Sequence, residues 1–402
     1  MFRLFIIALG FVSLLASAVT LACEFKGVTF SADFEAGKLD TCEVDENGTY
    51  VLSFLPEDKP INPSPWYYFS VTAAGDLLSK QAGKVDIVLT FDGYTPRYLP
   101  KVSYDRKSWK ITAFDTTKQG MTLTLPVSKQ PLYVAAQRPI PNSVYTNWLK
   151  QAEQDFAIKP FTIGKSTEGR TLSAFALEKP ENTEWVIFVG RQHPPEVTGA
   201  VAMFSFLNQF LTITSENNAF LSRFNVLVVP NINPDGVANG HWRHSVGHKD
   251  LNRDWNVFSQ PETKAVKTYL DKITNAGGKI VMGMDFHSTH NNVFYTIPVD
   301  ESIAPSDMVV GWLADLQTQT KGVFKVVDKP GTSPGKGVFK QFFADVYHVH
   351  GVTYEVGDNE PNEKTRYVAK HAANTLIDTL IATPAEEFYI KACADEAASC
   401  EQ

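Results

Sequence analysis

The chain of 402 residues has no dense run of lysine or arginine, and its formal net charge is −7. Proteins that bind nucleic acid carry basic patches, and an anionic membrane surface repels an acidic protein, so we expect neither nucleic acid nor a stable membrane partner. Internal repeats and low-complexity segments are also absent from the sequence. With 44% apolar and 20% charged residues, the composition is typical of a soluble globular protein, and a length of 402 residues predicts two domains. We therefore expect a small-molecule or peptide substrate.

Cysteine is scarce, and the four cysteines form two local pairs, Cys23 with Cys42 and Cys393 with Cys400. No histidine lies beside either pair at ligand spacing, which argues against a zinc site built on cysteine. An even number of cysteines in an exported chain favours disulfides instead. We predict the bonds Cys23–Cys42 and Cys393–Cys400.

Residues 1–22 have the pattern of a secretory signal peptide. A basic residue, Arg3, precedes an apolar run, and small residues follow, with cleavage expected after Ala18 or Ala22. This pattern predicts a secreted or periplasmic protein. Two alternatives remain open. One is an uncleaved membrane anchor, because the run is almost long enough to span a bilayer, and the other is a lipid anchor on Cys23.

Residues 23–130 are predicted to form a small N-terminal antiparallel β-sandwich domain. Six short segments of strand-like composition are separated by turn sequences such as Asn-Gly and Asp-Gly: 29–34, 49–55, 66–73, 84–91, 108–114 and 121–127. Short strands at roughly even spacing are typical of a sandwich. A proline-rich connection follows, up to residue 141.

From residue 142 onward, buried-looking apolar runs alternate with helical segments. The apolar runs are 185–190, 225–230, 279–286 and 351–356, and the helical segments are 198–212, 261–275, 303–319 and 361–382. This alternation predicts an α/β domain over 142–386, with a mixed, mostly parallel sheet and helices on both faces. Residues 387–402 are predicted to be a C-terminal tail closed by the second disulfide.

Reactive side chains follow the ends of these apolar runs, where open α/β sheets bind ligands. His193 and Glu196 come after the first run, and His287 ends the third. The two prolines between His193 and Glu196 exclude a helix interior, so this motif is expected on a strand-to-helix turn. Two histidines and one carboxylate, with an open fourth position, form a catalytic zinc set. We predict one zinc ion at these three residues, with His290 as the alternative to His287.

Glu355 lies in the fourth apolar run, where a carboxylate needs a partner or a function. A zinc-bound water has a lowered pKa and can lose its proton to a nearby carboxylate as it attacks a carbonyl. Glu355 is therefore the candidate general base.

The segment 233–255 connects the second and third apolar runs and is rich in polar groups. Arg253 offers a bidentate fork for a carboxylate, and Asn252 adds a donor beside it, as recognition of a peptide C-terminus requires. Arg243 is the candidate that stabilises the oxyanion of a tetrahedral intermediate.

Together these motifs resemble the zinc carboxypeptidase family related to carboxypeptidase A. They occur in that family's order: His193-x-x-Glu196, NPDG at 233–236, Arg243, DLNRDW at 250–255, DFH at 285–287 and YEVGD at 354–358. The central segment is most similar to the cytosolic carboxypeptidase-like branch, in which a β-sandwich precedes the catalytic domain. The resemblance implies the zinc carboxypeptidase fold and a metallocarboxypeptidase that acts on the C-termini of peptides or proteins.

The resemblance also implies a role for each site residue: zinc ligands at His193, Glu196 and His287, carbonyl polarisation by Arg243, carboxylate binding by Asn252 and Arg253, and general base then acid at Glu355. Pro195 departs from the family, because pancreatic-type relatives have an arginine there, so an auxiliary substrate-binding arginine is missing. The tyrosine that closes over substrate in many relatives has two candidates here, Tyr347 and Tyr295.

Several functional alternatives remain open. Lys336 and Lys340 are either solvated charges or a basic pocket that selects an acidic terminal residue, as in the deglutamylating members of the branch. The same zinc site also suits an amidase acting on a cell-wall peptide or an N-acyl amino acid. A further alternative is a catalytically silent peptide-binding protein, because a fold alone does not guarantee activity.

Overall fold

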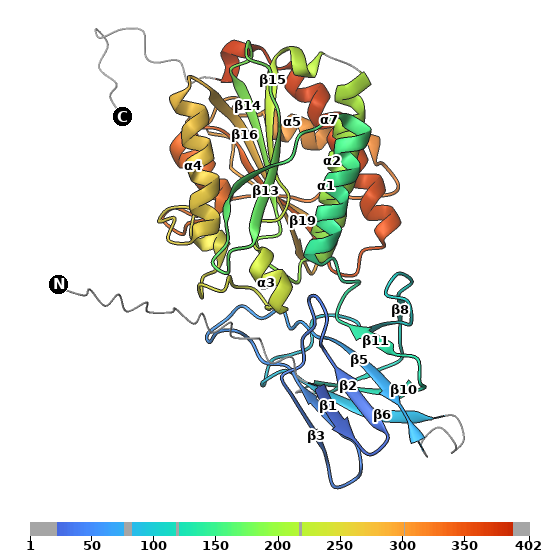
Figure 1. The fold of residues 1–402 in the computed structure, drawn as a ribbon. Coiled ribbons are helices and arrows are strands. Elements are labelled where there is room, and N and C mark those ends of the chain that lie inside the picture. Colours follow the sequence, from blue (N-terminus) through green and yellow to red (C-terminus); the bar gives the residue numbers. More distant parts are fainter. Residues whose placement is uncertain (1–21, 76–82, 118–119, 217–218, 301, 389–402) are drawn as a thin grey trace, which may run out of the picture.

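The computed structural model describes residues 22–75, 83–117, 120–216, 219–300 and 302–388. It consists of two parts that lie end to end (Figure 1). Strands up to Ala135 form a β-sandwich, and the chain from Asn142 onward forms a sheet covered by helices. Residues 1–21 of the predicted signal peptide, and the pair Cys393 and Cys400, lie outside the described residues.

Within the described residues, the sandwich contains a six-stranded and a five-stranded sheet. The order of the first is β1 (Ala22–Phe25), β2 (Val28–Ser31), β5 (Tyr68–Ala73), β11 (Leu132–Ala135), β7 (Lys101–Ser103) and β8 (Lys110–Ile111). The order of the second is β3 (Thr41–Val44), β4 (Tyr50–Ser53), β6 (Lys84–Thr90), β10 (Gly120–Pro126) and β9 (Asp115–Thr117). Neighbouring strands are antiparallel except β4 and β6, which run parallel. The predicted antiparallel sandwich is thereby confirmed.

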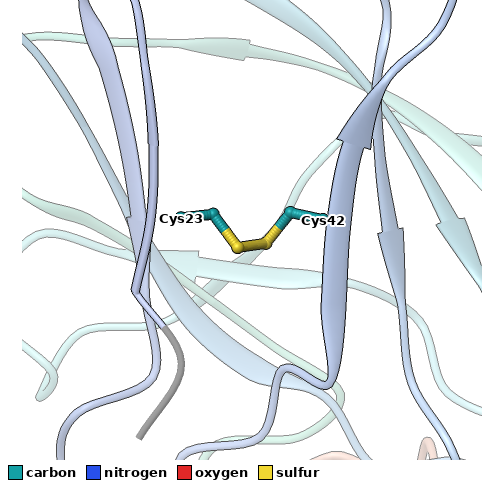
Figure 2. Close-up of a disulfide and its surroundings, with 2 residues drawn as sticks. All are labelled: Cys23 and Cys42. Carbon is teal, nitrogen blue, oxygen red and sulfur yellow. A yellow bond between two sulfur atoms is a disulfide. The ribbon is translucent and has the colours of Figure 1, made fainter.

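A disulfide joins the two sheets of the sandwich at one end. Cys23 lies in β1 of the first sheet and Cys42 in β3 of the second, with their Cα atoms 6.2 Å apart (Figure 2). This bond is the first of the two that the cysteine spacing predicts. It closes a short loop and therefore restricts the unfolded chain near the N-terminus of the sandwich.

The second part is built on a mixed sheet of eight strands within the described residues. Their order is β12 (Phe161–Lys165), β13 (Thr171–Leu177), β15 (Phe224–Val229), β14 (Glu184–Gly190), β16 (Lys279–Thr289), β19 (Gly351–Gly357), β17 (Val293–Thr296) and β18 (Asp328–Pro330). The four central strands, β15, β14, β16 and β19, are parallel to one another. These four are the strands predicted from the apolar runs, and the predicted mixed, mostly parallel sheet is confirmed.

Helices cover both faces of this sheet. On one face lie α1 (Asn142–Phe156), α2 (Val197–Glu216), α5 (Met308–Gln319) and α7 (Asn362–Ala382), and on the other lie α4 (Pro261–Asn275) and α6 (Phe339–Tyr347). Successive side chains of a strand point to opposite faces. In β14, Val186 and Phe188 accordingly belong to the core beneath α2, whereas Ile187 and Val189 belong to the core beneath α4 and α6. Burial on both faces explains why the central strands are uninterrupted apolar runs.

Three short elements complete the α/β part: α3 (Pro234–Asn239), η2 (Phe220–Ser222) and η3 (Leu251–Arg253), with η4 (Ala385–Phe388) at its end. Helix α3 lies at the end of the α/β part that faces the sandwich (Figure 1). Of the described residues, one window, Val197–Thr214 in α2, is long and apolar enough to cross a membrane. Because 72% of that window is buried inside the protein, we interpret it as a core helix.

Some boundaries differ from the expectations. The sandwich extends past the predicted boundary at 130 to Ala135, because Leu132 and Val134 are apolar and point into the core despite the flanking prolines. The predicted strand 108–114 is reduced to β8, which has two exposed residues. The helix expected from 303 begins at Met308 instead, since a residue before proline, here Ala304, disfavours helical backbone.

Candidate active site

The turn between β14 and α2 carries the first two predicted ligands, and Glu196 directly precedes α2. His287 lies near the end of β16, and Glu355 is its register partner on the adjacent parallel strand β19. Gly199, in the first turn of α2, permits a close approach to β16, because a Cβ there would stand 2.3 Å from the His287 carbonyl oxygen. The parallel sheet thus brings together groups that are far apart in the sequence.

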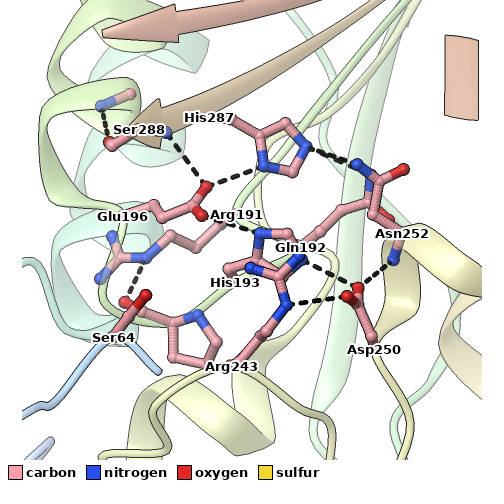
Figure 3. A network of polar contacts seen from close by, with 12 residues as sticks. Ser64, Arg191, Gln192, His193, Glu196, Arg243, Asp250, Asn252, His287 and Ser288 are labelled. Carbon is pink, nitrogen blue, oxygen red and sulfur yellow. Dashed lines mark hydrogen bonds and ion pairs between the residues drawn. The ribbon is translucent and has the colours of Figure 1, made fainter. Parts of the chain in front are cut away.

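The carboxylate of Glu196 contacts both histidine rings (Figure 3). Its Oε1 is 2.8 Å from His193 Nδ1, and its Oε2 is 2.7 Å from His287 Nδ1. One ligand atom from each of the three residues lies within 4.8 Å of the others, and all three side chains are buried. Burial alone would raise the pKa of Glu196, but the two histidines outweigh it and hold the pKa well below its usual range. Glu196 is therefore an ionised carboxylate.

This donor set fits a zinc ion, because two imidazoles and one carboxylate are a typical catalytic zinc set. The outer nitrogen of each ring is already held by an aspartate. His193 Nε2 is 2.9 Å from Asp250 Oδ1, and His287 Nε2 contacts Asp285 Oδ2. Carboxylates in this position fix the orientation of a ligating ring and leave its other nitrogen for the metal. The two Nδ1 atoms that face Glu196 are thus the available ligand atoms.

Asp250 and Asp285 are functional candidates that the motif spacing does not reveal. The available signal for Asp285 is its place two residues before His287 on one strand, because such residues lie on the same face. Gln192 donates a hydrogen bond to Asp285 and accepts one of 2.9 Å from the Trp255 indole. Gln192 and His287 thus both contact Oδ2 of this buried aspartate.

Glu355 lies beside the three ligands but is not bonded to any of them. Its side chain is partly buried, and its Oε2 has no hydrogen-bond partner among the described residues. Burial and, after it, the charge of Glu196 raise the pKa of Glu355 to about 7. A carboxylate with a pKa near neutrality is suited to taking up and returning a proton.

Arg243 and Asn252 adjoin the ligands through shared partners. Arg243 Nε donates to Asp250 Oδ2 at 2.8 Å, so Asp250 connects this arginine to His193 (Figure 3). Burial alone would raise the pKa of Asp250, but His193 and then Arg243 outweigh it and hold the pKa well below its usual range. Asn252 Nδ2 lies 3.4 Å from His287 Nε2, and its Oδ1 accepts from the backbone of Phe339 at 2.9 Å.

Arg253 is exposed, and its Nη1 donates to the Asn252 carbonyl at 2.6 Å. The alternative ligand His290 is exposed, its Nδ1 lies 3.9 Å from Asp358 Oδ2, and it is not part of the cluster of ligand atoms. Among the described residues, the structure therefore gathers His287, and not His290, with the other two ligands.

The two candidate tyrosines occupy different places. Tyr347 packs against Phe342 and Phe343 in the core beneath α6, and its hydroxyl is buried. Tyr295, on β17, lies close enough to Glu355 that burial and this carboxylate raise the pKa of its phenol. Of the two, Tyr295 is therefore the one near the site.

The two candidate lysines also differ in their surroundings. Lys336 is exposed, whereas Lys340 is buried and donates to the carbonyl oxygens of Thr296, at 3.0 Å, and of Gly331. Burial lowers the pKa of Lys340 to about 8. The structure thus does not place the two ammonium groups in one common pocket.

Taken together, the fold and the buried His-Glu-His set define a metal-dependent hydrolase with its site at the carboxyl ends of parallel strands. Comparison with known proteins gives the same class. The sequence profile of the zinc carboxypeptidase family matches residues 145–378, which is more than half of the chain. The protein belongs to the zinc carboxypeptidase family. This confirms the predicted family, and at the level of the family it confirms the predicted metallocarboxypeptidase class.

Individual relatives match over part of their length. An uncharacterized protein of Zymomonas mobilis is 26% identical over 257 residues, 60% of this chain and 64% of that protein. Cytosolic carboxypeptidase 2 of Danio rerio is 21% identical over 302 residues, 66% of this chain and 42% of that protein. The chain thus spans less than two thirds of the length of either relative.

Solved structures with the same fold cover both parts of the chain. A metallo-carboxypeptidase from Burkholderia cenocepacia has a TM-score of 0.71 and 16% identity, and covers 88% of this chain and 99% of its own. A metallo-carboxypeptidase from Pseudomonas aeruginosa has a TM-score of 0.71 and 17% identity, and covers 90% and 100%. At these identities the comparison establishes the fold.

Proposed function

We propose that this protein is a zinc-dependent metallocarboxypeptidase that hydrolyses the C-terminal peptide bond of peptides or proteins. The observation that carries the proposal is the buried cluster of His193, Glu196 and His287, with a carboxylate oxygen of Glu355 left unpartnered beside it. Membership of the zinc carboxypeptidase family supports the same activity.

Nδ1 of His193, Nδ1 of His287 and the carboxylate of Glu196 would hold one zinc ion. When bound, zinc supplies Lewis-acid polarisation of a carbonyl and lowers the pKa of water. Asp250 and Asp285 keep the two rings in orientation, and their charge raises the basicity of the ligand nitrogens.

Glu355 acts as the general base and then as the general acid. Its carboxylate takes a proton from the attacking water and later delivers it to the nitrogen of the departing amino acid. The pKa of about 7 that burial gives this group lets it exist in both protonation states near neutral pH. Because its Oε2 has no competing partner among the described residues, the proton can be accepted without first breaking a hydrogen bond.

Arg243, Asn252 and Arg253 orient the substrate. Arg243 is buried with its Nε held by Asp250, so its guanidinium is fixed and can donate to the scissile carbonyl oxygen as negative charge develops there. Arg253 is exposed, and its contact with the Asn252 carbonyl leaves further N–H groups for a terminal carboxylate. Asn252 supplies an additional donor beside it.

We also propose that the protein acts outside the cytoplasm, in a periplasm or after secretion. The signal-like pattern of residues 1–22 and the Cys23–Cys42 disulfide support this location, because disulfides persist in oxidising compartments. Fractionation of cells that produce the full chain would place the protein in the periplasm or medium, and recovery from the cytoplasm alone would contradict the proposal.

The activity is tested with the purified protein and a panel of peptides that differ in the C-terminal residue. Each peptide is offered with a free carboxylate and as the terminal amide, and zinc content is measured in parallel. We expect amino acid release from free C-termini only, with about one zinc per chain, loss on chelation and recovery with added zinc. Cleavage of cell-wall peptides or N-acyl amino acids alone would favour the zinc amidase. Bound zinc without any cleavage would favour a peptide-binding protein.

A further inference from the structure

A carboxylate of the sandwich binds the backbone of the loop that carries Arg243. Glu57 lies in the segment that follows β4, and it accepts three backbone hydrogen bonds from consecutive residues of the α/β part. The N–H of Trp242 donates to Oε2 at 2.7 Å, and those of Arg243 and His244 donate to Oε1 at 2.8 and 2.5 Å. A carboxylate that accepts several N–H groups makes strong, geometrically defined contacts.

The neighbouring acid, Asp58, binds the same loop through side chains. Its Oδ2 is 2.6 Å from His244 Nδ1, and its Oδ1 is 2.6 Å from His248 Nδ1. Two consecutive residues of the sandwich therefore fix the loop over residues 242–248. This attachment is separate from the contacts that the α/β part makes with the loop.

The opposite end of Arg243 is attached to the metal ligands. Its Nε donates to Asp250 Oδ2 at 2.8 Å, and Asp250 Oδ1 lies 2.9 Å from His193 Nε2. Within the described residues, Asp250 is the one hydrogen-bond partner of the Arg243 side chain. The position of this guanidinium thus depends on two contacts, that of Asp250 with Nε and that of Glu57 with the backbone N–H.

We propose that Glu57 is a positioning residue for Arg243, so that the sandwich completes the active site. This inference rests on the proposed function, in which Arg243 donates to the scissile carbonyl. Arginine has a long side chain, and a displacement of about 1 Å at a catalytic group can lower a rate by about a hundredfold. Loss of the Glu57 contacts releases the backbone of residues 242–244 and with it the guanidinium.

The first test is kinetic and uses the full-length, zinc-loaded protein. In Glu57→Gln one carboxylate oxygen becomes an NH2 group that opposes a backbone N–H, while the size of the side chain is kept. We expect kcat to fall by about tenfold to a hundredfold, with KM changed by less than about threefold, because Arg243 acts on charge that develops in the transition state. Glu57→Ala, which removes all three contacts, should lose more.

Glu35→Gln is the matched control. Glu35 is also a sandwich glutamate that accepts a backbone N–H of the α/β part, from Ser143 at 3.0 Å, but this contact lies at the start of α1. The control should keep wild-type kinetics. A double-mutant cycle with Arg243→Ala then separates positioning from general stability, since Glu57→Gln should have no further effect once Arg243 is gone. Wild-type kinetics in Glu57→Gln, or an equal loss with and without Arg243, would overturn the inference.

The second test does not depend on activity. Hydrogen exchange at the amides of residues 242–244 should be faster in Glu57→Gln than in the wild type, and unchanged in Glu35→Gln. Unchanged exchange in Glu57→Gln would overturn the inference even if the enzyme were active. If the wild-type protein cleaves no peptide, the proposed function fails, and hydrogen exchange still decides whether Glu57 holds this loop.

Discussion

The α/β part and the sandwich contribute to the candidate site in different ways. Every residue that we expect to touch metal or substrate lies in the α/β part, at the ends of its central strands or in the connecting segment 233–255. The sandwich contributes side chains that bind those strands and that segment from outside, such as Glu57 and Arg97. The reacting groups thus belong to one part of the molecule, whereas both parts contribute contacts that hold them.

Arg97 is a second side chain of the sandwich that contacts the strands carrying the site residues. It follows β6 in the sandwich, and its Nε and Nη2 bind Asp358 at 2.8 and 3.1 Å, while Nη2 also donates to the Ser288 carbonyl at 3.0 Å. Ser288 directly follows His287, and Asp358 lies three residues after Glu355. One partly buried arginine of the sandwich thus contacts the ends of both strands, the one that carries a ligand and the one that carries the base.

The largest effect is expected inside the α/β part. Glu355→Gln removes the group that accepts the proton, so kcat on a cleaved peptide should fall by about a hundredfold to ten-thousandfold, while zinc content stays the same. Glu360→Gln, five residues further on, is the control and should remain within about twofold of the wild type. Activity retained in Glu355→Gln would show that another group is the base.

Arg97→Met tests how strongly the sandwich holds the α/β part. Removing Arg97 leaves the buried Asp358 carboxylate without its charged partner, and breaking a buried pair in this way typically costs about 3 to 5 kcal/mol. We expect the free energy of unfolding, measured by denaturant titration, to fall by that amount. Lys267→Met breaks a partly exposed pair within α4, with Asp271 at 2.5 Å, and should cost less than about 1 kcal/mol. If Arg97→Met lowered the free energy of unfolding no more than Lys267→Met does, the Arg97 contact between the two parts would contribute little to stability.

Removing the disulfide is a change in the sandwich that should lower stability without changing the catalytic constants. Cys23 and Cys42 are 19 residues apart, and a loop of that size contributes about 3 kcal/mol through the unfolded chain. The variant with both cysteines replaced by serine should therefore unfold at lower temperature but keep wild-type kcat and KM well below that temperature. A lower kcat at a temperature well below unfolding would show that the disulfide also affects the geometry of the active site.

Asp285→Asn tests the aspartates that hold the ligand rings. The amide cannot accept from His287 as a charged group does, and changes of this kind typically weaken metal binding by about tenfold to a hundredfold. Competition with a zinc chelator measures the effect, and Asp315→Asn on the exposed face of α5 is the control. Unchanged zinc affinity in Asp285→Asn would show that Asp285 does not support metal binding.

The sequence predicts the central sheet and the gathering of the ligands because both depend on local signals. Runs such as 185–190 are apolar throughout, and reactive residues come directly after them. Helix α6 and the edge strands β3 and β9 are less apparent, since α6 follows a glycine-rich turn and the edge strands are short and exposed. Their existence depends on the neighbours that they pack against.

The positioning residues could not be predicted for a different reason. Glu57 and Trp242 are separated by 185 residues, and Arg97 and Asp358 by 261. Each is an ordinary charged residue in its local sequence, and its partner is determined only by how the sandwich docks on the α/β part. Asp250 and Asp285 lie within quoted motifs, but their contacts with the histidine rings require the folded sheet.

Anomalous diffraction at the zinc absorption edge, measured on crystals of the zinc-loaded protein, would locate the metal ion directly. We predict one anomalous peak, from a single zinc ion, at about 2.0 to 2.2 Å from Nδ1 of His193, Nδ1 of His287 and the carboxylate of Glu196. A peak at other residues, or no peak in protein that retains zinc by elemental analysis, would contradict the assignment of the site.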